Sequence, residues 1–242
     1  MRLGIMQPYF FPYLGHFDLI NQVDEWIVFD TPQYMRHHWV NRNRILHPNA
    51  GWQHITVPLR KHHQDTPINQ IEIAMEDDWR GRILRQLQHY RQRAPYYGQV
   101  IRFLEECFAD VSPYLAETNF LTLRKTCQRL GVATPLRVFS QMNLALTGAV
   151  EGPGDWALVI SRAAGASEYL NAAGGATLFD ESKFAAHDIK LTIQVFTHMT
   201  YPCGPYQFEP GLSIIDVMMW NSPEQIKQYL DTWRSAHSNK EG

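Results

Sequence analysis

Cysteine is scarce in this sequence, and neither sign of charge is in clear excess. The 242-residue chain has 3 cysteines, which are Cys107, Cys127 and Cys203. An odd number of widely spaced cysteines excludes a disulfide framework and paired zinc ligands. The 22 Lys and Arg residues nearly balance the 24 Asp and Glu residues. The molecule as a whole therefore lacks the positive field that binds nucleic acid or anionic membranes nonspecifically.

Long apolar runs are missing as well. Gln7 and Pro8 interrupt the chain soon after its start, so the first residues lack the apolar segment of a secretion signal. No run approaches the roughly 20 apolar residues that span a bilayer. We therefore expect a cytoplasmic protein without a membrane span. With 45% apolar and 12% aromatic residues, the composition predicts an ordered globular fold.

The first 30 residues alternate between strand-like and helix-like patterns. Residues 3–6 and 25–29 are apolar and predict short strands, and apolar residues recur at near-helical spacing between Phe17 and Val23. Strand, helix and strand form a βαβ unit, in which ligands bind at the carboxyl ends of parallel strands, here near Gln7 and Asp30. The prediction is an α/β fold that begins with the βαβ unit of a Rossmann-like parallel sheet.

A helical stretch interrupts this α/β pattern. Three successive segments between residues 77 and 131 carry apolar residues at helical spacing, and Asp77-Asp78 suits the first amino terminus. We predict a helical insert or subdomain over residues 77–131, within an α/β core made of residues 1–76 and 132–242. Further strands are expected at residues 55–59, 68–74, 136–139, 168–170 and 190–196, and helices at 155–164 and 226–233.

An aromatic and proline-rich loop follows the first predicted strand. Residues 7–16 read Gln-Pro-Tyr-Phe-Phe-Pro-Tyr-Leu-Gly-His. Two prolines restrict the backbone, so the rings are held stiffly enough to form the wall of a ligand pocket. Gln7, Tyr9 and Tyr13 are therefore candidate substrate-binding residues. The alternative is that the four aromatic rings simply pack in the core.

His16 lies at the predicted start of the first helix, where the helix dipole favours a neutral imidazole that accepts a proton. It is a candidate catalytic base, and a structural role is the alternative. The string Tyr-Leu-Gly-His at residues 13–16 resembles the His-x-Gly-His motif of nucleotidylyltransferases, whose two histidines stabilise phosphate charge. Tyr13 replaces the first histidine, which removes one phosphate ligand. The resemblance implies a nucleotidylyltransferase-like sheet.

Residues 31–64 form a positive segment in an otherwise balanced chain. They include no Asp or Glu, but five Lys or Arg residues and six His residues. Arginine binds phosphate or carboxylate oxygens with a planar fork of donors, and no local carboxylate competes here. The segment suits an anion such as a nucleotide diphosphate or a carboxylate, although a solvated basic loop is the alternative. The candidate substrate-binding residues are Gln33, Arg36, Trp39, Asn41, Arg42, Asn43 and Arg44.

Asp30 ends the second predicted strand and is the other candidate catalytic residue. It is placed to act as a base or to orient a substrate group, and capping a turn with Thr31 is the equal alternative. The adjacent pairs His37-His38 and His62-His63 point to different faces of any regular element and match no zinc spacing. We therefore predict no metal site.

Two later segments complete the candidate set. Asn171 precedes Gly174-Gly175, which permit a positive φ or a close backbone approach to a ligand, or make an ordinary turn. Ser213 and Asp216 form a Ser-x-x-Asp arrangement akin to a capping box at the start of a predicted helix. Asp216 is a further candidate substrate-binding residue. Cys203 lacks the neighbouring base that a nucleophile needs.

Four strings together resemble the WbqC-like protein family, which is found with bacterial surface-polysaccharide biosynthesis. They are residues 6–15 (Met-Gln-Pro-Tyr-Phe-Phe-Pro-Tyr-Leu-Gly), 39–45 (Trp-Val-Asn-Arg-Asn-Arg-Ile), 169–175 (Tyr-Leu-Asn-Ala-Ala-Gly-Gly) and 212–216 (Leu-Ser-Ile-Ile-Asp). The likeness extends over about residues 3–220, and His16 and His37-His38 depart from the family pattern. The resemblance implies transfer of glycine or another acyl group to the amine of an amino sugar during O-antigen (lipopolysaccharide) assembly.

The leading hypothesis is a cytoplasmic transferase that acylates or glycylates a nucleotide-linked amino sugar, with Asp30 or His16 as the base. No cofactor is firmly implied, and the acyl or aminoacyl donor stays open among a carrier-protein thioester, an aminoacyl-tRNA, coenzyme A and an adenylate. The oligomeric state stays open too. One alternative is a nucleotidyltransferase or adenylate-forming enzyme that uses a nucleoside triphosphate with Mg²⁺. The other is a noncatalytic nucleotide-sugar-binding protein.

Overall fold

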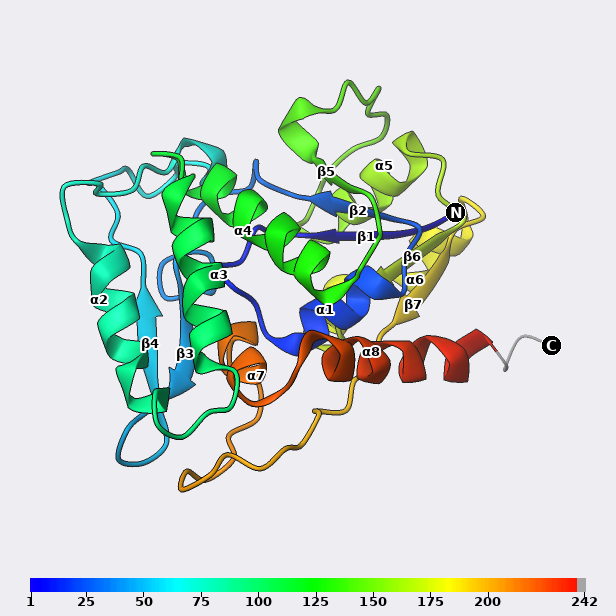
Figure 1. Cartoon of the computed structure of the whole chain (residues 1–242). Helices are drawn as coiled ribbons and strands as arrows, with labels where there is room; N and C mark the ends of the chain where they lie inside the picture. The colour runs from blue at the N-terminus through cyan, green and yellow to red at the C-terminus, as the bar shows by residue number, and fades with distance from the viewer. Residues whose placement is uncertain (239–242) are drawn as a thin grey trace.

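A five-stranded parallel sheet forms one half of the molecule (Figure 1). The computed structural model describes the backbone of residues 1–238 and the side chains of residues 1–232. In spatial order the strands are β5 (Leu136–Val138), β2 (Glu25–Val28), β1 (Arg2–Met6), β6 (Glu168–Asn171) and β7 (Lys190–Ile193). All four neighbouring pairs run parallel. The predicted α/β class, the amino-terminal βαβ unit and the three later strands of this sheet are confirmed.

The strand order creates a switch point between β1 and β6. From β1 the chain proceeds to β2 and then β5 on one side, and it later adds β6 and β7 on the other side. Open α/β sheets bind their ligands outside the carboxyl ends of the two strands where the order reverses. Here those ends lead into Gln7 and Ala172, so the loops after β1 and β6 border the expected ligand crevice.

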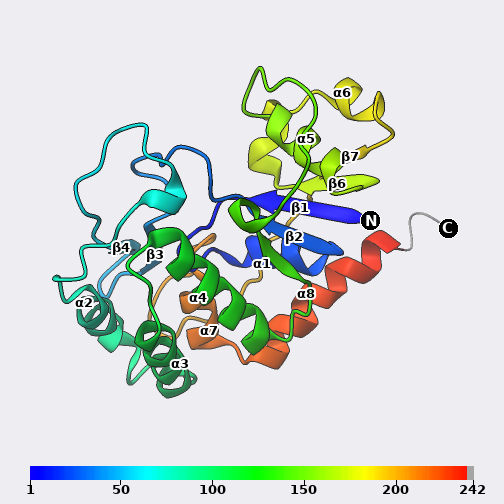
Figure 2. The same cartoon turned by 90° about the horizontal axis from the view of Figure 1, so that it is seen from above.

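Helices cover both faces of the sheet, as Figure 2 shows for α5 and α6 on one side and α1 and α8 on the other. These helices are α1 (Leu14–Asn21), α5 (Asp155–Ala163), α6 (Glu181–Ala185) and α8 (Pro223–Ser238), and α7 (Ile214–Trp220) precedes α8 in the chain. Because strand side chains alternate, Ile27 joins the α5 and α6 side, while Trp26 and Val28 join the α1 side. The sheet therefore lies between two hydrophobic clusters, one on each face.

An antiparallel hairpin follows β2 and lies apart from the parallel sheet. It consists of β3 (Arg42–Leu46) and β4 (Trp52–Thr56), with Arg44 opposite His54. The sequence reading missed β3, because Arg42 and Arg44 alternate with the buried residues Asn43 and Ile45 and conceal the apolar pattern. The hairpin forms one end of the molecule, and the carboxyl ends of β1 and β2 point toward it (Figure 1).

The strand predicted at residues 68–74 is wrong. The segment begins with a short 3-10 helix, η1 (Ile68–Gln70), and then makes only isolated bridges, such as Ile73 with Leu59. Its apolar residues Ile68, Ile71 and Ile73 are buried, and η1 packs against α4. The apolar spacing therefore reflects burial of an irregular segment rather than strand pairing.

The predicted helical stretch is present as α2 (Trp79–Gln86), η2 (Leu87–Tyr90), α3 (Tyr97–Ala109) and α4 (Leu115–Leu130). The Asp78 carboxylate accepts the Gly81 N–H at 3.0 Å, which confirms an acidic cap on α2. Gly131 ends α4 with a φ of 70°. Buried residues of this stretch join the same hydrophobic cluster as Phe10 and Ile214, so it packs directly onto the α1 side of the molecule.

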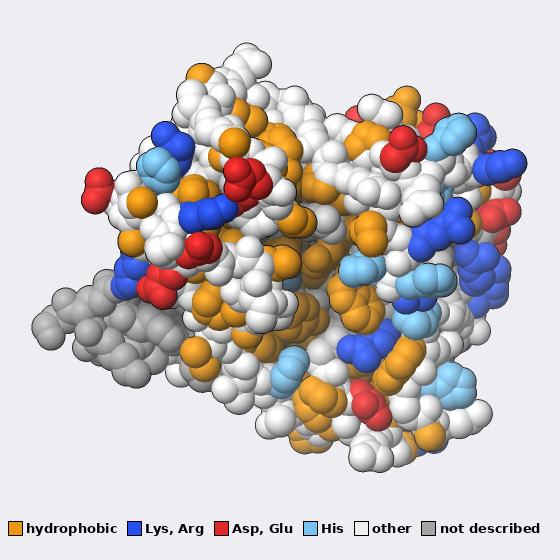
Figure 3. Space-filling model, turned by 180° about the vertical axis from the view of Figure 1, so that it is seen from behind, with side chains coloured by type: hydrophobic (Ala, Val, Ile, Leu, Met, Phe, Trp, Pro, Cys, Tyr) orange, Lys and Arg blue, Asp and Glu red, His pale blue; other side chains and the backbone are white. Residues whose placement is uncertain are grey.

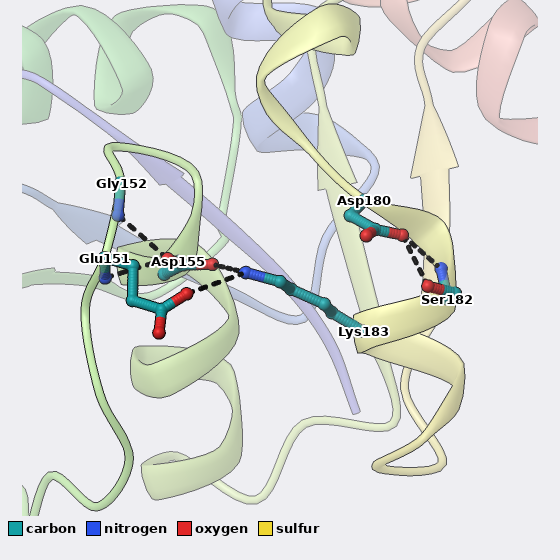
Figure 4. A network of polar contacts seen from close by, with 6 residues as sticks. All are labelled: Glu151, Gly152, Asp155, Asp180, Ser182 and Lys183. Atoms are coloured by element: carbon teal, nitrogen blue, oxygen red, sulfur yellow. Dashed lines mark hydrogen bonds and ion pairs between the residues drawn. The ribbon is translucent and has the colours of Figure 1, made fainter.

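The structure specifies two local features after residue 150 that the sequence left open. Asp155 does not cap α5 but is its first residue, and its carboxylate accepts the N–H groups of Glu151 and Gly152 at 3.0 and 2.9 Å and pairs with Lys183 at 2.8 Å (Figure 4). The pair Gly174-Gly175 has no positive φ, since it lies in the 3-10 helix η4 (Ala173–Leu178). The remaining short 3-10 helix is η3 (Phe139–Gln141).

Within the described residues, no helix combines the length and the apolar character needed to cross a bilayer.

Candidate functional site

A small pocket, here called the aromatic pocket, lies beyond the carboxyl end of β1. Its lining comes from three parts of the chain and consists of Tyr9, Pro12, Tyr13, Trp39, Asn43, Arg44, His198 and Gly211. Its volume is about 210 Å³. Pockets for drug-sized ligands begin at roughly 300 Å³, so this one holds part of a ligand, such as a single ring.

The loop after β1 divides its rings between the core and the pocket. Phe10 and Phe11 are buried, and the Phe10 N–H donates to the Trp39 carbonyl at 2.9 Å. The buried Asn43 amide donates to the carbonyls of Phe10 and Phe11 at 3.1 and 2.8 Å, which ties the loop to β3. Tyr9 and Tyr13 are left to line the pocket. Of the four rings, two therefore pack in the core and two line the pocket, so each of the alternatives considered from the sequence applies to two rings.

Arg44 is fixed at the edge of the aromatic pocket. Its guanidinium lies 5.2 Å from the Trp39 ring centroid and 5.0 Å from that of Trp52, and it donates to the Gly211 carbonyl at 3.3 Å. Cation–π contacts at exposed sites contribute about 0.5–1 kcal/mol each. Sequence reasoning missed Trp52, which only the hairpin register places beside Arg44. The pocket thus has an oriented positive charge between two indoles.

His198 lies at the rim of the aromatic pocket, with its ring centroid 6.2 Å from that of Tyr13 and 5.2 Å from that of Phe196. Partial burial lowers the pKa of His198 below its ordinary value. Its imidazole is therefore neutral at neutral pH and able to accept a proton. The sequence offered little to single it out, because residues 194–213 form no regular element.

A second cavity, here called the basic groove, lies on the outer side of the hairpin. It has a volume of about 470 Å³ and no acidic residue in its lining, which includes Arg36, His37, Asn41, Arg42, His54, Arg60, Lys61 and His62. Burial, followed by the charges of Arg42 and Arg44, lowers the pKa of His54. Figure 3 shows Lys, Arg and His side chains gathered on the hairpin side, beside a central hollow lined by hydrophobic side chains.

The predicted basic segment is therefore divided between the two cavities. Arg44 lines the aromatic pocket, whereas Arg36 and Arg42 line the basic groove. The Asn41 amide is used within the fold, since it accepts the Tyr34 hydroxyl at 2.9 Å and donates to the Val57 carbonyl at 3.0 Å. Gln33 lines neither cavity and donates to the Gln64 carbonyl at 2.7 Å.

The two candidate catalytic residues lie outside both cavities. Asp30 is 2% exposed, and its carboxylate accepts the N–H and the hydroxyl of Ser140 at 3.0 and 2.5 Å. His16 is 1% exposed and packs against the Trp26 ring. Burial lowers the pKa of His16 to about 3, and its Nε2 has no hydrogen-bond partner within the described part of the chain. Both side chains are components of the protein interior.

Gln7 and Asn171 stand at the carboxyl ends of β1 and β6. Among residues 1–232, neither side chain makes a hydrogen bond. A Cβ atom on Gly175 would lie 2.4 Å from the Asn171 amide nitrogen, so the glycine leaves room for this side chain. The two amides therefore border the switch point with their bonding capacity unused.

Asp216 belongs to a buried polar network. It is 1% exposed, and its carboxylate accepts the hydroxyls of Tyr90 and Tyr201, the latter at 3.1 Å, and the Leu46 N–H at 3.4 Å. Burial raises the pKa of Asp216 to about 6. It makes no capping box; the cap predicted for Ser213 is confirmed, because its hydroxyl accepts the Ile215 N–H at 3.2 Å. Asp216 therefore joins three segments of the fold.

Two other kinds of site, a cysteine nucleophile and a metal site, have no support among the described residues. Burial raises the pKa of the Cys203 thiol to about 12, which makes it a poor nucleophile. No group of three His, Cys, Asp or Glu side chains in the described residues is arranged to hold a metal ion.

The five-stranded parallel sheet, with an aromatic, arginine-bearing pocket beyond its first strand, defines a protein of the α/β class. The chain belongs to the WbqC-like protein family, whose model matches residues 7–228. It is also similar to the uncharacterized protein Rv1507c of Mycobacterium tuberculosis (strain ATCC 25618 / H37Rv), at 28% identity over 234 residues, which cover 95% of this chain and 97% of that protein. No solved structure matches the chain. The family resemblance is thus confirmed, and it indicates a role related to polysaccharide biosynthesis.

Proposed function

We propose that the protein is a transferase of surface-polysaccharide biosynthesis that acylates, for example glycylates, the amine of a nucleotide-linked amino sugar. The observation that carries this proposal is the aromatic pocket, where three aromatic side chains and Arg44 converge at the end of β1. Aromatic faces bind sugar and base rings, and a guanidinium binds phosphate. These are the two chemical features of a nucleotide-linked sugar.

The acceptor would place one ring in the aromatic pocket. Tyr9, Tyr13 and Trp39 offer stacking surface, and Arg44 faces an attached phosphate. Gln7 and Asn171 have free amides at the switch point and suit sugar hydroxyls. This arrangement agrees with a Rossmann-like, nucleotidylyltransferase-like sheet, in which the ligand crosses the strand ends beside the reversal in strand order.

The reaction needs a group that accepts a proton from the acceptor amine. The amine nitrogen attacks the carbonyl carbon of the donor, the bond from that carbon to the donor's leaving group breaks, and the nitrogen loses one proton to a base. Asp30 and His16 stay predicted bases, but each is buried away from the cavities. His198 is a third candidate, and it is the one that lines the pocket.

Product analysis by mass spectrometry tests this function. The protein is incubated with nucleotide-linked amino sugars and with acyl and aminoacyl donors, and we expect an amide product heavier by one acyl group. Arg44→Ala should raise the KM for the acceptor about tenfold, because a charge-assisted hydrogen bond is lost. The matched control is Arg85→Ala, since Arg85 pairs with Asp78 on α2 and lines neither cavity.

Three results would count against the proposed reaction. Pyrophosphate release that depends on a nucleoside triphosphate and Mg²⁺ would instead identify a nucleotidyltransferase. Tight binding of nucleotide sugars without any product would identify a binding protein. An unchanged acceptor KM in the Arg44→Ala variant would remove Arg44 from the acceptor site.

A further inference from the structure

We propose that the basic groove is a second ligand site, separate from the aromatic pocket, which binds a nucleotide carrying two or more phosphate groups as part of the acyl donor. The identification of this ligand as part of the acyl donor rests on the proposed function. Its chemical class is argued from the groove itself. It replaces the single anion site expected from residues 36–44 with two sites, one for each substrate.

The charge of the groove exceeds what the protein itself neutralises. Arg36, Arg42 and Lys61 make no ion pair with any residue from 1 to 232, and only Arg60 reaches carboxylates, those of Glu72 and Glu76 at 3.5 and 3.3 Å. Cations gathered without acidic partners repel one another and focus a positive potential in a concave site. A ligand with several negative charges relieves that repulsion, whereas a single carboxylate leaves most of it.

The groove is also organised before any ligand arrives. Arg42 donates through Nη2 to the His37 carbonyl at 2.5 Å, and His37 has a φ of 65°, a left-handed conformation uncommon outside glycine. Buried Tyr34 and Val57 contribute to the lining beside these residues. Arg42 is therefore held by the turn while its remaining N–H groups stay available, as a phosphate-binding guanidinium requires.

The course of the chain separates the two cavities. They share no lining residue, and within one short segment His37 lines the groove while Trp39 lines the pocket. Arg44 is held on the pocket side between Trp39 and Trp52, and Arg42 on the groove side by His37. The two arginines are two residues apart along β3, which is about 7 Å. Ligands in the two cavities can therefore meet without sharing a site.

The sizes of the cavities fit this division. The groove, at about 470 Å³, has more than twice the volume of the pocket, at about 210 Å³. A nucleotide fits the larger space and a single ring the smaller. Both substrates would then be bound together, and the acyl group would pass directly from the leaving group of the donor to the acceptor nitrogen in a ternary complex.

Calorimetric titration with ADP, pyrophosphate and adenosine tests the groove. We expect ADP to bind and pyrophosphate to compete with it, while adenosine binds at least about tenfold more weakly because it lacks phosphates. Arg42→Ala should weaken ADP binding about tenfold. Arg36→Ala should do the same, and its exposed side chain makes no hydrogen bond or ion pair in the described chain, so its loss leaves the fold intact. Arg85→Ala is the control.

The position of the ligand is read from the tryptophan indole N–H signals in NMR spectra. No tryptophan lines the groove, whereas Trp39 lines the pocket and Trp52 flanks Arg44. We expect the Trp39 signal to stay in place when ADP saturates the groove, whereas the Trp52 signal should move, because the Trp52 ring lies 4.9 Å from the ring of His54, which lines the groove. Movement of the Trp39 signal together with weaker ADP binding by Arg44→Ala would overturn the separate site, since one anion would then occupy the pocket.

The groove and the proposed reaction can fail independently. Absence of ADP binding, or unchanged binding by both Arg36→Ala and Arg42→Ala, overturns the groove proposal even if amide product is formed. Binding of ADP as described, with no amide product from any donor, supports the groove and contradicts the transferase.

Discussion

Polar residues at the carboxyl edge of the parallel sheet and on the outer face of the hairpin differ in how fully the fold uses their hydrogen-bonding groups. Asp30, just after β2, is buried, and its carboxylate is engaged by the N–H and hydroxyl of Ser140. Arg44, within β3, is half-buried and held by two indoles, and it donates one hydrogen bond, to a carbonyl. A polar residue can bind a ligand only if the fold leaves some of its bonding capacity unused.

Asp216 extends this comparison into the core. It follows the same pattern as Asp30, with a buried carboxylate whose partners come from β3, η2 and the segment before α7. Removing such a group should affect folding first, whereas removing a hairpin or pocket residue should affect binding or turnover first.

The largest effect expected is on stability, from Asp216→Ala. The substitution leaves the Tyr90 and Tyr201 hydroxyls without their acceptor, at about 1–3 kcal/mol for each unsatisfied group, while the Leu46 N–H keeps the Tyr90 hydroxyl at 3.0 Å. We expect the free energy of unfolding, measured by urea titration, to fall by about 3–5 kcal/mol. Tyr201→Phe, which removes one hydroxyl, serves as the milder comparison. A loss below that of Tyr201→Phe would contradict the central place of Asp216 in the network.

The next effect is on turnover, from His198→Gln. A positioned general base contributes about 10²- to 10⁴-fold, so kcat should fall at least about a hundredfold while the acceptor KM changes little. Asp30→Asn keeps an oxygen for the Ser140 N–H and should retain most of the turnover. Measuring kcat and KM for both variants shows whether the base is His198 at the pocket rim or Asp30 in the protein interior. Full activity of His198→Gln together with loss of activity in Asp30→Asn would identify Asp30, just after β2, as the base.

The pH dependence of stability is the third test. Because the folded protein raises the pKa of the Asp216 carboxyl from 3.8 to about 6, the folded state binds that proton more tightly than the unfolded chain. This contribution is complete below pH 3.8 and is lost as the pH rises to about 6. Relative to Asp216→Asn, the wild type should lose about 2–3 kcal/mol between pH 4 and 7. Parallel stability curves from urea unfolding would contradict the assignment.

The smallest effect is expected from Trp52→Ala on the hairpin face. Arg44 loses one of two flanking indoles, worth about 0.5–1 kcal/mol, but keeps Trp39 and the Gly211 carbonyl. The acceptor KM should therefore rise about two- to fivefold, with the melting temperature nearly unchanged. A rise in the acceptor KM as large as that of Arg44→Ala would mean that Trp52 itself contacts the substrate.

Local patterns in the sequence were sufficient where a single element is regular. The βαβ unit, the three helices between Trp79 and Leu130, and the Ser213 cap follow from apolar spacing and end residues. The hairpin did not follow, because charged residues on its outer face conceal the alternation of β3. Segment 68–74 was misread because burial against α4 produces the same apolar spacing as a strand.

The candidate site was predicted in part for a related reason. Tyr9, Tyr13, Trp39 and Arg44 were candidates because aromatic and arginine residues are concentrated in two short strings, and all four line the aromatic pocket. His198 and Trp52 reach the same place through tertiary contacts that no local spacing records. The burial of Asp30 and His16 depends on Ser140 and Trp26, which the sequence gives no reason to place beside them.

A crystal structure with a bound nucleotide-linked amino sugar tests the central claim most directly. The account predicts one ring of the ligand against Tyr13 and Trp39, with a phosphate oxygen about 3 Å from the Arg44 guanidinium. A ligand bound elsewhere, with the aromatic pocket holding none of its rings, would contradict the account.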